Sequence, residues 1–118
     1  MELTSLGQFL RKLRIERLEL MKNMADKLGL SVSYLSCIET GSREFNKSKL
    51  YDEIISKYQL NKEQIKEFDK AISDSLKSVS VSMTDRTDAQ KEMVWALARK
   101  IEELNDEQAN QIKDILGD

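Results

Sequence analysis

The chain has 118 residues with a net charge of −2; 34% are charged and 6% aromatic, with four glycines, one cysteine, and neither proline nor histidine. This composition favours one all-α domain with an extension over a many-turned β fold. It also argues against an internal disulfide, a metal or other cofactor, and acid–base catalysis, so we expect no enzyme activity.

The first two helices follow from apolar spacing and from residues that start and stop helices. A helix is predicted over 5–18, with Ser5 as its cap and Gln8 completing a capping box. A second helix is predicted over 21–28, where Gly29 provides the C-terminal stop. The apolar residues at helical spacing in the first helix are Leu6, Phe9, Leu10, Leu13 and Leu18.

A third helix is predicted over 31–40 and has clear signals at both ends. Ser31 is a good cap, and Gly41 follows the last helical residue. Leu35 and Ile38 lie one turn apart, so they are expected to face inward together.

Two more helices complete the first part of the chain. Asn46 or Ser48 opens a fourth helix that runs to Tyr58. The sequence "NKEQ" at 61–64 is a capping box for a fifth helix over 61–76. Residues 1–76 are therefore expected to form one five-helix domain.

The segment 77–87 has no helical pattern. Within it, Val79, Val81 and Met83 alternate with serines over 78–83, which suits either an extended solvated linker or a short strand. We favour the linker. A strand here would have no partner in this chain, so it would pair with the same strand of a second subunit.

Two helices are predicted in 88–118, over 88–104 and 106–116, with Asn105 and Gln108 as a capping box between them. The first is apolar on more than one face, so it needs a cover. The five-helix domain, a second copy or a different protein could supply it, and we favour a second copy. The expected dimer interface consists of Val79, Val81, Met93, Trp95, Leu97 and Ile101.

The stretches "LGQFLRKLRIER" and "MADKLGLSVSYLSCIETG" carry a resemblance to a known family. Their ordered positions are Ala25, Gly29, Leu30, Ser31, Leu35, Ile38, Glu39 and Gly41. With these residues, about 5–76 resembles the Xre/Cro-type helix-turn-helix family, which has the lambda repressor-like fold. The resemblance implies a double-stranded DNA-binding domain whose third helix, 31–40, lies in the major groove.

The resemblance also implies roles for individual residues. Arg14 and Glu39 occupy positions that the family often pairs as a structural clamp. Leu20 and Met21 stand where family members often have Thr or Ser followed by Gln, so a cap and a phosphate contact are expected to be lost. The residues expected to meet base edges are Val32, Ser33, Ser36 and Cys37.

No Lys or Arg lies in the third helix, so the contacts with DNA phosphates are expected from residues around it. Residues 1–60 hold ten Lys/Arg against eight Asp/Glu, and residues 61–118 hold nine against thirteen, which places any nucleic-acid contact in the first half. The residues expected to contact phosphate are Lys22, Thr40, Arg43, Lys47 and Lys49.

The leading functional hypothesis is a homodimeric repressor on a two-fold symmetric operator with half-sites one helical turn apart. One alternative is an antitoxin that neutralises a toxin through its acidic half, 61–118, and represses its own operon. A second is a protein-interaction scaffold that has lost DNA binding. A redox switch at Cys37 is disfavoured because no base or histidine lies nearby in the sequence.

Two further expectations concern metals and location. Asp85, Asp88 and Glu92 lie near one helix start, and we interpret them as a solvated face that complements the helix dipole rather than as metal ligands. No run is long and apolar enough to span a bilayer, and the N-terminus is unlike a signal peptide. We therefore expect a cytoplasmic protein without membrane contact.

Overall fold

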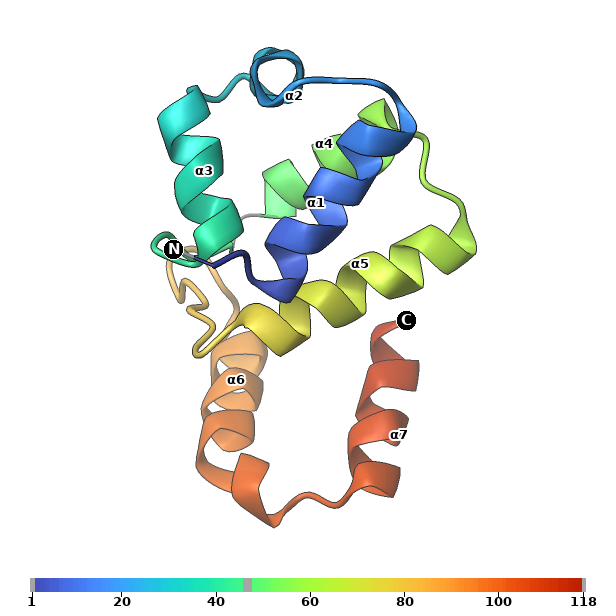
Figure 1. Cartoon of the computed structure of the whole chain (residues 1–118). Helices are drawn as coiled ribbons and strands as arrows, with labels where there is room; N and C mark the ends of the chain where they lie inside the picture. Colours follow the sequence, from blue (N-terminus) through green and yellow to red (C-terminus); the bar gives the residue numbers. More distant parts are fainter. Residues whose placement is uncertain (1, 46–47, 118) are drawn as a thin grey trace. The chain divides into compact units, whose positions relative to one another are not determined.

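The computed structural model describes residues 2–45 and 48–117, and every regular element in this part is a helix (Figure 1). The all-α prediction is therefore confirmed for the described residues. The chain divides into two compact units, Met1–Ser80 and Val81–Asp118. The first unit contains α1 (Ser5–Glu16), α2 (Met21–Leu28), α3 (Val32–Thr40), α4 (Ser48–Lys57) and α5 (Lys62–Ser75). The second contains α6 (Asp88–Lys100), the 3-10 helix η1 (Ile101–Glu103) and α7 (Asp106–Leu116).

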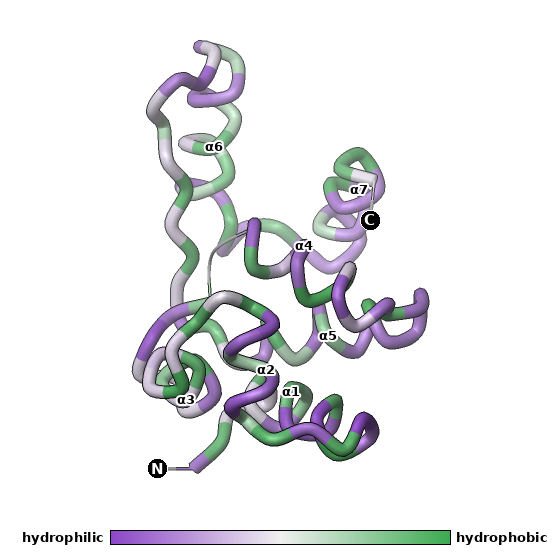
Figure 2. The backbone as a smooth tube through the Cα atoms, turned by 90° about the horizontal axis from the view of Figure 1, so that it is seen from above, coloured by the Kyte–Doolittle hydropathy of each residue, from purple (hydrophilic) through white to green (hydrophobic). Residues whose placement is uncertain are grey.

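The first unit has a single hydrophobic core. Helix α1 packs against α5 and α3, and α2 packs against α3 and α4. Hydrophobic and hydrophilic residues alternate along these helices, as a helix with one buried face requires (Figure 2). At the centre, the Phe68 ring lies 5.1 Å from the rings of both Phe9 and Tyr51 and 5.9 Å from that of Phe45.

The capping residue and the end of α1 differ from the prediction. Thr4, not Ser5, is the cap: its hydroxyl accepts a hydrogen bond from Gly7 N, and Ser5 is the first helical residue. The helix ends at Glu16 because Leu18 adopts a left-handed conformation with φ of 54°. Leu18 is 94% exposed, so its expected place on the inward helical stripe is wrong.

The other predicted caps in the first unit are confirmed. Gly29 ends α2 with φ of 68° and Gly41 ends α3 with φ of 82°, both in the left-handed region that glycine adopts without strain. Asn61 and Gln64 form the expected capping box at the start of α5. Helix α4 begins at Ser48, and the alternative start Asn46 lies outside the described residues.

The second unit follows the predicted pattern with two changes. Helix α6 stops at Lys100, and Ile101 begins the 3-10 helix instead of continuing the α-helix. Thr87 and Gln90 form a capping box that the sequence reading missed, whereas the expected box at α7 is present. Within the described residues, 78–83 forms no strand.

A polar cluster ties the connection between α1 and α2 to the end of α4. The hydroxyl of Tyr58, which is fully buried, donates to Glu19 Oε2 at 2.7 Å. Lys27 forms an ion pair with the other carboxylate oxygen of Glu19, and its ammonium nitrogen lies 4.6 Å from the centre of the Tyr58 ring. Arg17 donates to the Tyr58 carbonyl. The residue that follows α4 is therefore joined to α2 and to the connection before it, although Tyr58 lies 39 residues after Glu19 in the sequence.

The surroundings of Glu19 predict an acid-dependent loss of stability. Burial raises the pKa of the Glu19 carboxyl, but hydrogen bonds from Lys27 and Tyr58 and the charges of Lys27 and Arg17 outweigh it and hold that pKa below its usual value of 4.5. A carboxyl with a lowered pKa contributes stability above about pH 4.5, and this contribution disappears as the pH falls through the folded-state pKa.

We expect Glu19→Gln to lower the free energy of unfolding at pH 7 by about 1–2 kcal/mol, because it removes a charged acceptor from two donors. The deficit should shrink as the pH falls from 5 toward 3. Urea unfolding at several pH values measures this difference. Glu16→Gln, at an exposed position of α1, is the matched control. A pH-independent deficit in Glu19→Gln would contradict the assignment.

None of the helices in the described part of the chain reaches the length and apolarity that crossing a membrane requires.

Candidate nucleic-acid interface

One side of α3 packs into the core, and the start of the helix is capped. Its first turn is capped by Ser31, whose hydroxyl accepts from Tyr34 N at 3.0 Å. On the inner side, Leu35, Ile38 and Glu39 are 1%, 2% and 0% exposed. The inner side of α3 is therefore fixed in the core, and its opposite side faces outward.

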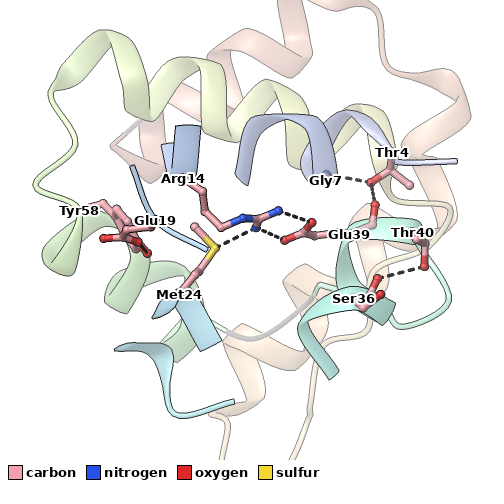
Figure 3. Close-up of polar contacts among 9 residues, drawn as sticks. All are labelled: Thr4, Gly7, Arg14, Glu19, Met24, Ser36, Glu39, Thr40 and Tyr58. Atoms are coloured by element: carbon pink, nitrogen blue, oxygen red, sulfur yellow. Dashed lines mark hydrogen bonds and ion pairs between the residues drawn. The ribbon is translucent and has the colours of Figure 1, made fainter. Parts of the chain in front are cut away.

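The buried contact between α1 and α3 is an ion pair between Arg14 and Glu39 (Figure 3). The two guanidinium nitrogens of Arg14 donate to the two carboxylate oxygens of Glu39 at 2.5 and 3.1 Å. Arg14 also contacts the sulfur of Met24 in α2 at 3.3 Å. This is the clamp expected from the resemblance, and it joins three helices at the inner side of α3.

A second contact fixes the C-terminal end of α3. The amide and the hydroxyl of Thr4 both donate to the carbonyl oxygen of Glu39, at 3.0 and 3.1 Å. Next to this contact, a Cβ atom added to Gly7 would lie 2.1 Å from the same oxygen. The first turn of α1 therefore reaches α3 only because position 7 has no side chain.

The four residues expected to meet base edges differ in how accessible they are. Val32 is 45% exposed and Ser33 is also exposed. Ser36 and Cys37, one turn further along α3, are half-buried. The outward surface of α3 is therefore widest at its first turn.

Thr40 is engaged within its own helix (Figure 3). Its hydroxyl lies 3.1 Å from the carbonyl of Ser36, to which it donates, and 3.2 Å from the hydroxyl of Ser42. A threonine hydroxyl has one hydrogen to donate. A phosphate contact from Thr40 would therefore require this hydroxyl to rotate away from Ser36.

Exposed cations lie in the segments that precede and follow α3 in the chain. The guanidinium of Arg43 lies 5.9 Å from the centre of the Tyr34 ring. Lys49, at the start of α4, lines a shallow groove together with Tyr34 and Ser31. Lys22 is exposed in the first turn of α2. Lys47 lies outside the described residues.

The structure adds Tyr34 to the candidate site. This half-buried side chain of α3 packs against the core, lines the groove next to Lys49 and lies beside Arg43. Its place within the predicted helix and its aromatic ring were visible in the sequence. Its contact with Arg43 depends on how the chain turns after Gly41, which the sequence pattern did not specify.

The start of α2 keeps part of a capping arrangement. Leu20 precedes the helix and has no side-chain oxygen to accept from its first turn. Asn23 nevertheless accepts from Leu20 N at 2.9 Å. The expected loss of a side-chain cap at Leu20 therefore leaves first-turn N–H groups of α2 available to donate to another partner, close to Lys22.

The predicted interface residues of the C-terminal part are accessible. The exposed fractions are 67% for Val79, 55% for Val81, 53% for Met93, 61% for Trp95, 39% for Leu97 and 59% for Ile101. Each is available for contact with another molecule.

Metal-ligating residue types and the single cysteine were also located in the described part of the chain. No group of three or more Asp, Glu or Cys side chains there is arranged to hold a metal ion, and Asp85, Asp88 and Glu92 form no such group. Cys37 is a half-buried free thiol.

Comparison with protein-family models, with curated proteins and with solved structures finds no match to this chain. The geometry around α3 is therefore the basis for a functional assignment.

Proposed function

We propose that the first unit binds double-stranded DNA with sequence preference and acts as a transcriptional regulator, with α3 in the major groove. Two features support this proposal: the resemblance of residues 5–76 to the Xre/Cro-type family, and the five helices of the first unit. The observation that carries it is the two-sided construction of α3. Leu35, Ile38 and Glu39 anchor one side, while Val32 and Ser33 are exposed on the other.

The exposed side of α3 suits a surface that contacts bases and discriminates modestly between them. The major groove is wide enough for an α-helix, and serine hydroxyls can donate to or accept from base edges. Val32 offers methyl groups for contact with the methyl of thymine. Because no arginine lies on α3, the bidentate contact with guanine is absent and single contacts must supply the discrimination.

Phosphate contacts would supply most of the affinity. Arg43 beside Tyr34 and Lys49 beside the start of α3 flank the reading surface on separate elements. Lys22 adds a third cation at the start of α2. Each cation that neutralises a phosphate releases counterions, so the affinity should fall with salt concentration.

Binding of the full chain to DNA from upstream of its own gene tests the proposal. Footprinting and titration at two salt concentrations should show a protected site and preference over random DNA of equal length. Absence of a footprint at low salt would overturn the proposal. That result would favour the scaffold hypothesis, in which α3 is retained without DNA binding.

Two sets of substitutions separate the contribution of phosphate contacts from that of base contacts. We expect Arg43→Gln and Lys49→Gln each to weaken binding to all sequences and to reduce the slope of log affinity against log salt by about 0.9. Ser33→Ala should instead reduce preference at one base position by about 1 kcal/mol and leave the salt slope unchanged.

The matched control for the charge substitutions is Lys70→Gln. Lys70 is an exposed lysine on α5 that pairs with Asp74 at 3.4 Å, away from the proposed contact residues. Its replacement should leave both affinity and salt slope unchanged. Equal losses from Lys70→Gln and Arg43→Gln would show that binding follows net charge and not the proposed surface.

A second candidate function, an antitoxin, is favoured by the second unit. None of its described residues is buried, and it carries more carboxylates than cations. Such a surface could cover a basic toxin while the first unit represses the operon. A neighbouring co-transcribed gene whose expression is toxic only without this chain would support that function, and a solitary gene would count against it.

A further inference from the structure

The second unit has helices but no core. Not one described residue of α6, η1 or α7 is buried. Large apolar side chains stay exposed, including Trp95 at 61%, Ile115 at 84% and Leu116 at 69%. Segments shorter than about 40 residues rarely hold a fold without a disulfide, a metal or another subunit. A chain with one cysteine has no internal disulfide, so the cover must be a protein surface: the first unit of the same chain, a second copy or a different protein.

The helices themselves are specified by local chemistry. Thr87 and Gln90 bond reciprocally across the start of α6, and Asn105 and Gln108 do the same at α7. Gly117 ends α7 in the left-handed conformation. Defined helices with exposed apolar side chains are typical of interface elements and not of disordered tails.

Each helix carries an apolar stripe. Met93 and Leu97 lie four residues apart on α6, and Ile101 continues this spacing at the start of η1. On α7, Ile112 and Leu116 share a face by the same spacing. Hydrophobic and hydrophilic positions alternate along both helices (Figure 2).

Trp95 lies off the α6 stripe. It is two residues from both Met93 and Leu97, so its side chain leaves the helix on a different side. There the guanidinium of Arg99 lies 5.9 Å from the centre of its ring. Trp95 is therefore expected at the edge of an interface built on the stripe.

The charges of the two helices are complementary. Residues 88–100 hold three Lys/Arg against two Asp/Glu, whereas 101–117 hold one lysine against five carboxylates. A partner that fits both helices must present both signs, and a second copy of this unit does so. Opposite charges favour contact of α6 with α7 of the second copy over contact of α7 with α7.

We propose that the second unit is a dimerisation element in which the Met93–Leu97–Ile101 stripe packs against α7 of a second copy. Two copies then form a four-helix assembly in which each chain contributes α6 and α7. The dimer does not depend on the proposed DNA binding, and its test uses the protein without DNA. It would also place two copies of α3 in one molecule.

The first test is the mass of the full chain in solution by sedimentation or light scattering. The wild type should have twice its chain mass of 13.6 kDa across the micromolar range. Leu97→Asp places a charge in the stripe and should weaken association at least about 30-fold, as removal of an anchor residue does. Leu18→Asp is the matched control, because Leu18 is an exposed leucine of the first unit. It should leave the dimer intact.

The second test asks which helices meet. One variant carries Arg99→Glu and Lys100→Glu at the end of α6. The other carries Glu103→Lys in η1 and Glu107→Lys in α7. Each variant alone should dimerise more weakly than the wild type, because α6 and the partner's α7 region would then carry like charges. An equimolar mixture should recover association as a heterodimer.

Three results would overturn the proposal. A monomeric wild type across the micromolar range would leave the second unit to a different protein, such as a toxin. Equal weakening by Leu18→Asp would place the contact in the first unit. Charge variants that stay weak when mixed would exclude contact between α6 and the second copy's α7. Helix content by circular dichroism should be unchanged in all variants, which separates loss of association from unfolding.

Discussion

Glu39→Gln is expected to lower the free energy of unfolding of the first unit by about 3–5 kcal/mol. The substitution leaves Arg14 buried and charged without a counter-charge, which is the costly way to break a buried ion pair. The side chains of Arg14 and Glu39 are only 8% and 1% exposed, so solvent cannot take over the lost interaction. Urea unfolding followed by circular dichroism measures the difference. The expected loss is a large share of the total free energy of unfolding of a small domain.

Two comparisons identify the ion pair as the cause. Replacing both partners with apolar residues, as Arg14→Met with Glu39→Leu, should recover most of the loss because no buried charge remains. Asp74→Asn breaks the exposed pair with Lys70, whose side chain is 78% exposed, and should cost less than about 0.5 kcal/mol. A Glu39→Gln loss as small as the Asp74→Asn loss would show that solvent reaches the pair in solution.

This ion pair also links stability to the proposed function. Glu39 lies on the inner side of α3, and Arg14 connects it to α1 and, through Met24, to α2. Without the pair, α3 would keep its apolar anchors Leu35 and Ile38 but lose its polar one. At a temperature where Glu39→Gln is still folded, we therefore expect weaker DNA binding with an unchanged salt slope.

Local chemistry explains why most helix ends were predictable. Ser31, Gly41 and Asn61 act within a few residues of their own position, so the sequence contains the needed information. The predicted cap of α1 was wrong because Thr4 and Ser5 are both good capping residues, and the contact of Thr4 with the Glu39 carbonyl favours Thr4. That contact joins residues 35 apart in the sequence and has no local signal.

The candidate site was predictable in its residues more than in its contacts. Helical spacing separated the inward Leu35 from the outward Val32, and the resemblance paired Arg14 with Glu39. The bond from the Thr40 hydroxyl to its own helix and the position of Arg43 beside Tyr34 depend on rotamers and on the path after α3. Helical periodicity predicts the face of the helix on which a side chain lies, but it does not predict which group its polar atoms bond to.

Gly7→Ala is expected to destabilise the first unit by about 3 kcal/mol or more, through overpacking against the backbone of Glu39. The added Cβ would lie 2.1 Å from the carbonyl oxygen of Glu39 and 2.9 Å from its carbonyl carbon. To make room, α1 must shift away from α3, which breaks both hydrogen bonds from Thr4. Thermal and urea unfolding measure the loss.

Gly29→Ala is the matched control, because it makes the same change where there is space. No atom lies within 4 Å of a Cβ built on Gly29, but its φ of 68° is unfavourable for alanine. Its cost should therefore be about 1–2 kcal/mol, from backbone strain alone. If Gly7→Ala cost less than Gly29→Ala, the close approach of α1 to α3 would not exist in solution. The support for the outward face of α3 would then have to come from Arg14, Leu35 and Ile38 without Thr4.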